Sequence, residues 1–249
     1  MNLDTIIAVR PTKTIYRDGD KIIKLFNEGY NKANVLNEAL NQSRLEATEL
    51  NIPKISEVNK IDGKWAIVSE YIDGTTLADF IKNNPEKKSE YLDMFVNLQI
   101  QVHEQRVPLL NKLKDALSRK IFETDLDATT RFELQTRLES MPKHKKVCHG
   151  DFNPTNIIIK NDGAPYIIDW AHVTQGNASA DVAITYMQFI LGGCNDTAKE
   201  YLDLFCDKTD TKQQYIQDWL PITAAARMAK GNADEFELLN RWVNVVEYE

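Results

Sequence analysis

The stretch His149-Gly-Asp-Phe-Asn-Pro-Thr-Asn156, followed thirteen residues later by Asp169-Trp170, decides the fold of this chain. It combines two carboxylates, Asp151 and Asp169, with the side-chain amide of Asn156. Oxygen ligands of this kind suit Mg²⁺ if folding brings them together. Whether they meet depends on the local secondary structure.

The pattern around this stretch predicts a strand, a loop and a hairpin. Val147 is expected in a short strand, and two more strands are predicted over residues 156–160 and 165–169. Asn161-Asp-Gly163 between them is a strong hairpin signal, because Gly readily adopts the positive φ that a tight turn needs. The three polar side chains are therefore expected at one end of a small β-ladder.

HGDFNPTN followed by IIDW resembles the catalytic loop and the metal-binding aspartate of the aminoglycoside phosphotransferase and choline kinase family, which is related to the protein kinases. Protein kinases write the loop as H-R-D-x-x-x-x-N and the metal motif as D-F-G. Here Asp151 and Asn156 have the same spacing, Gly150 replaces the arginine, and Asp169-Trp-Ala171 replaces D-F-G. The resemblance covers roughly residues 14 to 190.

This resemblance implies an α+β, bilobal, protein-kinase-like fold, and the remaining sequence is compatible with it. We expect a β-rich N-terminal nucleotide-binding lobe over residues 1–72 and a larger helical C-terminal lobe, catalytic and substrate-binding, over residues 73–249. In the first lobe, strands are predicted at a hairpin over 14–26 and at 55–58 and 64–70, with a helix over 31–50. In the second, helices are predicted over 76–83, 88–106, 110–123, 127–140 and much of 178–249.

By the same resemblance, Asp151 accepts or orients the proton of the attacking substrate hydroxyl. Asn156 and Asp169 hold the Mg²⁺ that bridges the phosphates of ATP. Such chemistry needs alignment and charge neutralisation rather than a covalent intermediate. A Cys148–His149 nucleophile and base is disfavoured, because adjacent strand residues point to opposite faces.

The family also requires a strand lysine and a helical glutamate upstream. Lys24 is expected to contact the α- and β-phosphates, and Glu38 is expected to pair with it. Lys21 is the alternative lysine, although it adjoins the predicted turn. Glu46 and Glu49 are the alternative glutamates.

The phosphate-covering segment departs from the protein-kinase pattern. Val9-Arg-Pro-Thr-Lys-Thr14 occupies the place of the glycine-rich loop and contains no glycine. Thr12 and Thr14 could offer hydroxyl and backbone donors to phosphate instead. Weaker ATP binding, or use of another nucleoside triphosphate, is left open.

Three further assignments rest on position within the family pattern. Glu70 and Ile72, in the segment Ser69–Gly74, resemble the linker whose backbone hydrogen-bonds the purine ring. His103 is expected to pack against the catalytic loop as a structural residue. Asp181, at the start of a helix, is expected to support that loop.

Composition excludes several classes of protein. The 249 residues are 43% hydrophobic and 27% charged, which argues against disorder and small disulfide scaffolds. The formal net charge of −7 argues against nucleic acid as a partner. Three widely spaced cysteines favour a reducing cytoplasm. Neither an export signal nor a membrane span is predicted.

The expected activity is transfer of the γ-phosphate of ATP to a hydroxyl of a small molecule. Acidic residues recur in the C-terminal helices, which suits a cationic amino alcohol or aminoglycoside, although solvated helix faces have the same composition. The alternative is a non-catalytic kinase-like module that binds a nucleotide or another ligand. A protein substrate is disfavoured, because only AHVTQGNA follows Trp170 before the next helix and A-P-E is missing. The oligomeric state is not predicted.

Overall fold

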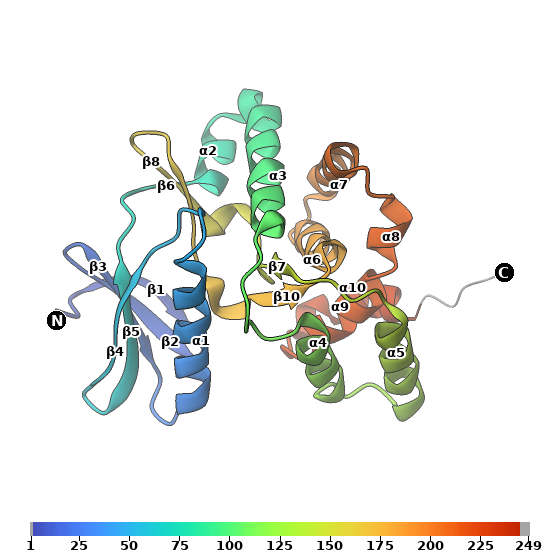
Figure 1. Ribbon diagram of the computed structural model, residues 1–249, viewed down its shortest axis with the longest axis horizontal. Helices are drawn as coiled ribbons and strands as arrows, with labels where there is room; N and C mark the ends of the chain where they lie inside the picture. Colours follow the sequence, from blue (N-terminus) through green and yellow to red (C-terminus); the bar gives the residue numbers. More distant parts are fainter. Residues whose placement is uncertain (1, 245–249) are drawn as a thin grey trace. The chain divides into compact units, whose positions relative to one another are not determined.

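The computed structural model describes residues 2–244 (Figure 1). Contacts among them divide the chain into two compact units. The first unit runs up to Lys87 and also contains Pro154–His172, and the second contains Lys88–Asn153 and the residues from Val173 on. The boundary between a β-rich and a helical lobe that was expected after residue 72 stays a prediction.

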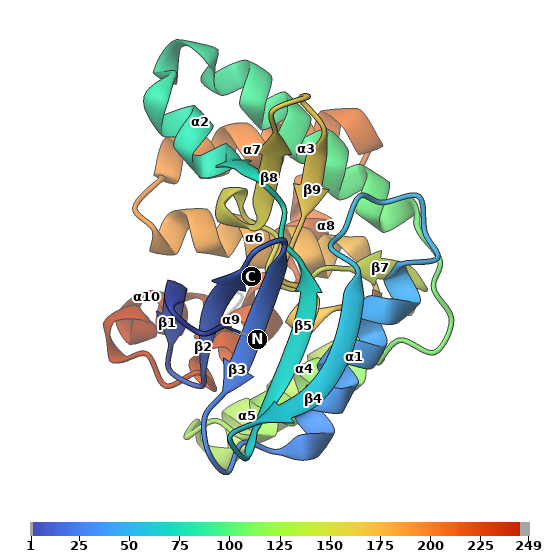
Figure 2. The same cartoon turned by 90° about the vertical axis from the view of Figure 1, so that its left-hand side faces the viewer.

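The first unit is built on a five-stranded antiparallel sheet in the order β1-β2-β3-β5-β4, whose strands lie side by side in Figure 2. Its strands are β1 (Thr5–Arg10), β2 (Lys13–Asp18), β3 (Lys21–Phe26), β4 (Ile55–Ile61) and β5 (Lys64–Glu70). Asp18 pairs with Lys21 across the β2–β3 turn, where Gly19 takes the left-handed conformation at φ 62°. The predicted hairpin over 14–26 is therefore present.

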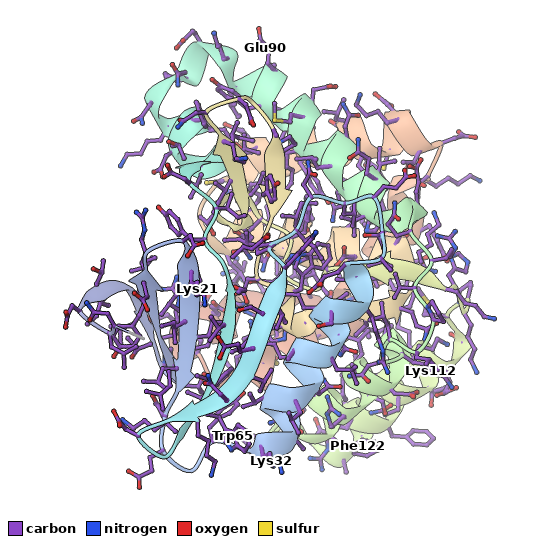
Figure 3. The ribbon with its side chains drawn as sticks, turned by 60° about the vertical axis from the view of Figure 1, so that its left-hand side comes forward. Lys21, Lys32, Trp65, Glu90, Lys112 and Phe122 are labelled. Atoms are coloured by element: carbon purple, nitrogen blue, oxygen red, sulfur yellow. The ribbon has the colours of Figure 1, made fainter. Side chains whose placement is uncertain are left out.

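Helix α1 (Lys32–Leu45) lies along one face of this sheet (Figure 2). Its N-cap is Asn31, whose side chain accepts the backbone N–H of Ala33. Val35 and Ala39 face the sheet and pack with buried side chains of β3 and β5. At its start, Lys32 lies beside Trp65, with Nζ 5.6 Å from the ring centre (Figure 3).

A second, three-stranded sheet completes the first unit, in the order β6-β8-β9. Its strands are β6 (Gly74–Thr76), β8 (Ile157–Lys160) and β9 (Pro165–Ile167), and α2 (Leu77–Asn83) follows β6. β6 approaches β8 so closely that a Cβ at Gly74 would lie 2.3 Å from the Ile159 carbonyl oxygen. β8 and β9 form the predicted hairpin, with Gly163 at φ 86° in the turn.

The second unit is mainly helical and is built around α6, which contacts α7, α8 and α9 (Figure 1). Its helices are α3 (Lys88–Glu104), α4 (Leu113–Phe122), α5 (Ala128–Ser140), α6 (Ala178–Leu191), α7 (Asn195–Thr209), α8 (Gln213–Gln217), α9 (Leu220–Met228) and α10 (Phe236–Val243). Phe95, Phe152 and Tyr201 form an aromatic cluster, with centroids 4.7 Å apart for the first two. Two short strands, β7 (Lys146–Cys148) and β10 (Thr174–Gly176), pair antiparallel.

Most of the segment 9–14 lies in two paired strands, and its expected role in covering the phosphates stays a prediction. β1 and β2 leave only Pro11-Thr12 as a turn, and Thr14 is paired with Val9 on one side and Leu25 on the other. Glycine and Asn-Gly signals are missing from this turn, so the sequence pattern did not indicate a hairpin.

The strand expected over 165–169 ends at Ile167, because Asp169 takes a left-handed φ of 60° and Trp170–His172 forms a 3-10 turn. No helix among residues 2–244 is long and apolar enough to cross a membrane.

Candidate active site

The loop that begins at His149 is held from behind by a buried carboxylate. Asp181, in the first turn of α6, accepts the backbone N–H groups of His149 at 3.1 Å and Gly150 at 2.7 Å. Its Oδ2 also lies 2.9 Å from His103 Nε2. Burial alone would raise the pKa of Asp181, but the hydrogen bond and charge of His103 outweigh it and lower the pKa. Both residues are buried and fix the loop backbone.

Asp151 is half-buried and has its own side-chain partner. Gln188 of α6 donates from Nε2 to Asp151 Oδ1 at 2.5 Å, and the other amide atom, Gln188 Oε1, is buried without a hydrogen-bond partner in the described part of the chain. Arg227 of α9 binds Glu235 through two hydrogen bonds of 2.6 Å. These bonds raise the pKa of Arg227, and the charge of Asp151 adds to the effect.

Sequence reasoning missed Gln188 and Arg227. Each is far along the chain from Asp151, and neither belongs to a recognisable motif. The available signal for Gln188 was a single amide in the otherwise apolar segment ITYMQFIL. A polar residue on such a helix face needs a partner when it is buried.

In the first unit, Lys24 connects its own strand β3 to helix α1 and to the segment that follows the β8–β9 hairpin. Lys24 of β3 is 12% exposed, and its Nζ donates to Glu38 Oε1 of α1 and to Asp169 Oδ1, both at 3.0 Å. Burial alone would lower the pKa of Lys24, but the two carboxylates outweigh it and raise the pKa above the usual value. The ammonium is therefore kept charged.

The alternatives to these residues lie elsewhere. Lys21 is 43% exposed and pairs with Glu57 at 3.7 Å. The Glu46 carboxylate accepts a backbone N–H from β4, and Glu49 is exposed. Among the candidate lysines and glutamates that the sequence offered, Lys24 and Glu38 are the two that pair with each other.

A further lysine, which the sequence analysis did not consider, reaches the same carboxylates. Lys13 is the first residue of β2 and is 13% exposed. Its Nζ lies 3.7 Å from Glu38 Oε1 and 3.9 Å from Asp169 Oδ1. In this segment the sequence analysis considered only Thr12 and Thr14.

Asn156 and Asp169 belong to the first unit, whereas Asp151 belongs to the second. The backbone carbonyl of Asn156 accepts the N–H of Ile168 at 2.9 Å, which holds Asn156 beside the segment that carries Asp169. The expectation that all three polar side chains share one end of the ladder stays a prediction.

The donor set of Asn156 and Asp169 fits Mg²⁺. One carboxylate and one amide oxygen suit an ion that keeps water and phosphate ligands rather than using an all-protein cage. The described residues contain no cluster of three or more His, Cys, Asp or Glu side chains able to hold a metal.

The residues assigned to the nucleotide by position lie at strand ends. Thr12 is in the β1–β2 turn, and its carbonyl accepts the N–H of Asn27 at 2.9 Å. Glu70 is the last residue of β5. Its backbone N–H donates to the Lys54 carbonyl at 3.0 Å, and its carboxylate accepts the backbone N–H of Lys54 at 3.1 Å. Ile72 is buried just beyond it.

Cys148 is buried in β7, where burial raises the pKa of its thiol well above the usual value. A thiol in this state is a poor nucleophile. The second unit instead provides a fixed loop with a carboxylate, and the first unit provides a charged lysine and a carboxylate–amide pair.

A sequence model of the phosphotransferase enzyme family matches residues 13–215. Similar solved structures include a thermostable mutant of aminoglycoside phosphotransferase APH(4)-Ia, with a TM-score of 0.70 and 13% identity, covering 96% of this chain and 92% of that one. Choline kinase LicA from Streptococcus pneumoniae has a TM-score of 0.67 and 15% identity, with 99% and 94% covered. The aminoglycoside-3'-phosphotransferase of type VIII has a TM-score of 0.64 and 16% identity, with 90% and 92% covered.

At these identities the likeness shows the fold, which is the kinase-like α+β fold of these enzymes. No curated protein matches the chain significantly in sequence.

Proposed function

Because the chain belongs to the phosphotransferase enzyme family, we propose that it transfers the γ-phosphate of ATP to a hydroxyl group of a small molecule, with Mg²⁺ as cofactor. The observation that carries the proposal is the contact of Lys24 with both Glu38 and Asp169. A lysine and glutamate pair next to a metal-binding aspartate is the arrangement on which kinases rely to hold a nucleoside triphosphate.

Lys24 binds the α- and β-phosphates in this proposal, and Glu38 orients the lysine. Asn156 and Asp169 hold Mg²⁺, which neutralises charge that develops on the phosphates. Because Asp169 also accepts a hydrogen bond from Lys24, the cation that binds phosphate and the carboxylate that binds metal are positioned by each other.

The remaining proposed contacts, to the purine ring and to the phosphates, involve mainly backbone groups. We assign the backbone at Glu70 and Ile72 to the purine, and the hydroxyl and backbone groups of Thr12 and Thr14 to the phosphates. The use of ATP is consistent with related structures, since one solved APH(4)-Ia complex contains AMP-PNP and hygromycin B.

Asp151 is the proposed acceptor of the proton that leaves the substrate hydroxyl. Its carboxylate is oriented by the amide of Gln188 at 2.5 Å, and the loop that carries it is fixed by Asp181. A positioned carboxylate of this kind aligns the hydroxyl for in-line attack, which is the largest contribution that a protein makes in phosphoryl transfer.

For the acceptor we propose a hydroxylated small molecule, and more specifically a cationic amino alcohol or an aminoglycoside. The net charge of −7 supports a cationic substrate. The related structures are an aminoglycoside kinase and a choline kinase, which act on such molecules by their names. We propose the cytoplasm as the location, since all three cysteines are free thiols.

The test is ATP-dependent phosphate transfer to a panel of hydroxylated amines that includes choline and hygromycin B, measured by ADP release and by mass of the product. We expect one class of acceptor to gain a single phosphate, and Asp151→Asn to abolish that gain. ADP release that does not depend on any acceptor in the panel would argue against the proposed substrates. Nucleotide binding without transfer to any acceptor would favour the non-catalytic binding module.

A further inference from the structure

Lys13 is an almost buried cation next to the carboxylates of the proposed nucleotide site. It follows directly on the exposed turn Pro11-Thr12, yet its own side chain is only 13% exposed. Its Nζ lies 3.7 Å from Glu38 Oε1 and 3.9 Å from Asp169 Oδ1. Its Nζ also lies over the ring of Phe26, 5.8 Å from the ring centre.

The two lysines use these carboxylates differently. Lys24 donates to both at hydrogen-bond distance, 3.0 Å each. Lys13 stands beyond hydrogen-bond distance from both, and no other acceptor lies within reach of its ammonium among residues 2–244. An ammonium has three N–H donors, so Lys13 is attracted to this place by charge while its donors stay available.

The backbone that carries Lys13 is held firmly. Lys13 pairs with Arg10 across the β1–β2 turn and with Phe26 of β3. The turn itself is tied to Asn27, which donates its backbone N–H to the Thr12 carbonyl and its side-chain amide to the Pro11 carbonyl, each at 2.9 Å. The ammonium is thus delivered from a fixed strand rather than from a mobile loop.

We propose that Lys13 is a second phosphate-binding lysine, which supplies N–H donors and a positive charge where protein kinases cover the phosphates with a glycine-rich loop. This inference rests on the proposed function. The two lysines and two carboxylates balance in charge, and if Asp169 held Mg²⁺, Lys13 would share one of its two counter-charges with the metal. The phosphates beyond the first then provide the acceptors that its N–H donors lack.

The proposal predicts that the effect of Lys13 depends on the number of phosphates. Calorimetric titration of ATP, ADP and AMP with Mg²⁺ should show that Lys13→Met weakens ATP binding about 10- to 100-fold, as expected for a lost hydrogen bond between charged groups, and leaves AMP binding nearly unchanged. Lys21→Met is the matched control, since it removes an exposed lysine from the neighbouring strand and should change neither affinity.

Two more variants separate phosphate binding from a structural role. Lys13→Gln removes the charge with a polar side chain, and it should reproduce the loss even if methionine disturbs folding at this position. Lys13→Arg keeps the charge and should retain most of the ATP affinity. Unfolding temperatures of all variants, measured without nucleotide, show whether the fold is preserved.

The opposite results are equally clear. If the neutral variants bind ATP as tightly as the wild type, or lose ATP and AMP affinity equally, Lys13 only neutralises Glu38 and Asp169 and the proposal fails. Failure of the proposed function would give a different result from failure of the Lys13 proposal, because the wild type itself would then bind no ATP.

Discussion

Asp169 combines an unusual backbone conformation with the central contact of the proposed nucleotide site. Its φ of 60° lies in the left-handed region, which non-glycine residues adopt at a cost of about 1 kcal/mol or more. Aspartate tolerates this region better than most residues. The conformation ends strand β9 early and places Oδ1 3.0 Å from Lys24 Nζ. The strained residue is therefore the one whose carboxylate is needed for the proposed chemistry.

The difference between the two β3 lysines gives a direct prediction at this scale. Lys24→Ala should lower phosphate transfer by about 100-fold or more, because it removes a charge-assisted contact to phosphate and leaves Glu38 without its main partner. Lys21→Ala should leave transfer unchanged, since Lys21 is exposed and pairs only with Glu57. The measurement is the initial rate with saturating acceptor, and the reverse pattern would move the assignment to Lys21.

Gln188 provides a second prediction. Gln188→Leu should lower transfer about tenfold, because a carboxylate loses a hydrogen bond that orients it, and should leave the affinity for ATP unchanged. In an Asp151→Asn background the same substitution should have no further effect on rate, since the group it positions is gone. An equal loss in both backgrounds would show that Gln188 acts independently of Asp151.

At the scale of elements, helix α6 is the support of the catalytic loop. Its first turn carries Asp181, which is fully buried and accepts two backbone N–H groups of the loop. Because the Asp181 carboxylate accepts these donors, the helix and the loop form one hydrogen-bonded structure. The same helix carries Gln188 two turns later, which explains why one element controls both the loop and its carboxylate.

This support predicts a pH dependence of stability. The pKa of Asp181 is lowered in the folded protein, so its contribution is fully present above the ordinary aspartate pKa and is lost as pH falls through the folded value. Asp181→Asn should destabilise the protein by about 3 kcal/mol at pH 7, as expected when one partner of a buried charged network is removed. In urea unfolding, the gap between wild type and variant should narrow below about pH 4. A gap that is independent of pH would contradict the role of the charge.

Elements with strong local patterns were predictable from the sequence, and short ones were not. Helices expected over 88–106 and 127–140 end within about two residues of α3 and α5, because apolar spacing and flanking caps or prolines act locally. β6 and β10 have three residues each, too few for any period to show. β1 was missed because its turn is Pro11-Thr12, which has none of the usual hairpin residues.

The candidate site shows the same limit. The contact of Lys24 with Glu38 was expected from the family resemblance, because Lys24 lies on a predicted strand and Glu38 on a predicted helix. Lys13, Gln188 and Arg227 could not be found, because their approach depends on how separate elements pack rather than on spacing along the chain. Of these, Lys13 lies in the segment 9–14, in which the sequence analysis considered only Thr12 and Thr14 as phosphate contacts.

At the scale of the whole molecule, the fold survives with little sequence identity. Related structures share only 13–16% of residues with this chain, yet at least nine-tenths of each chain is covered. Apolar patterning and a small set of polar residues are thus sufficient to specify the kinase-like fold. The fold does not specify the substrate in this way, because one fold can carry many different activities.

The most direct test of the central claim is calorimetric titration of ATP and GTP into the wild type and Asp169→Ala, each with and without Mg²⁺. The account predicts that the wild type binds at least one of the two nucleotides more tightly with Mg²⁺, by about tenfold or more, and that the Mg²⁺-dependent part disappears in Asp169→Ala. Binding without Mg²⁺ should survive in the variant, because Lys24 keeps Glu38 and loses a competing carboxylate. Absence of binding of both nucleotides by folded wild type, or an undiminished effect of Mg²⁺ in Asp169→Ala, would contradict it.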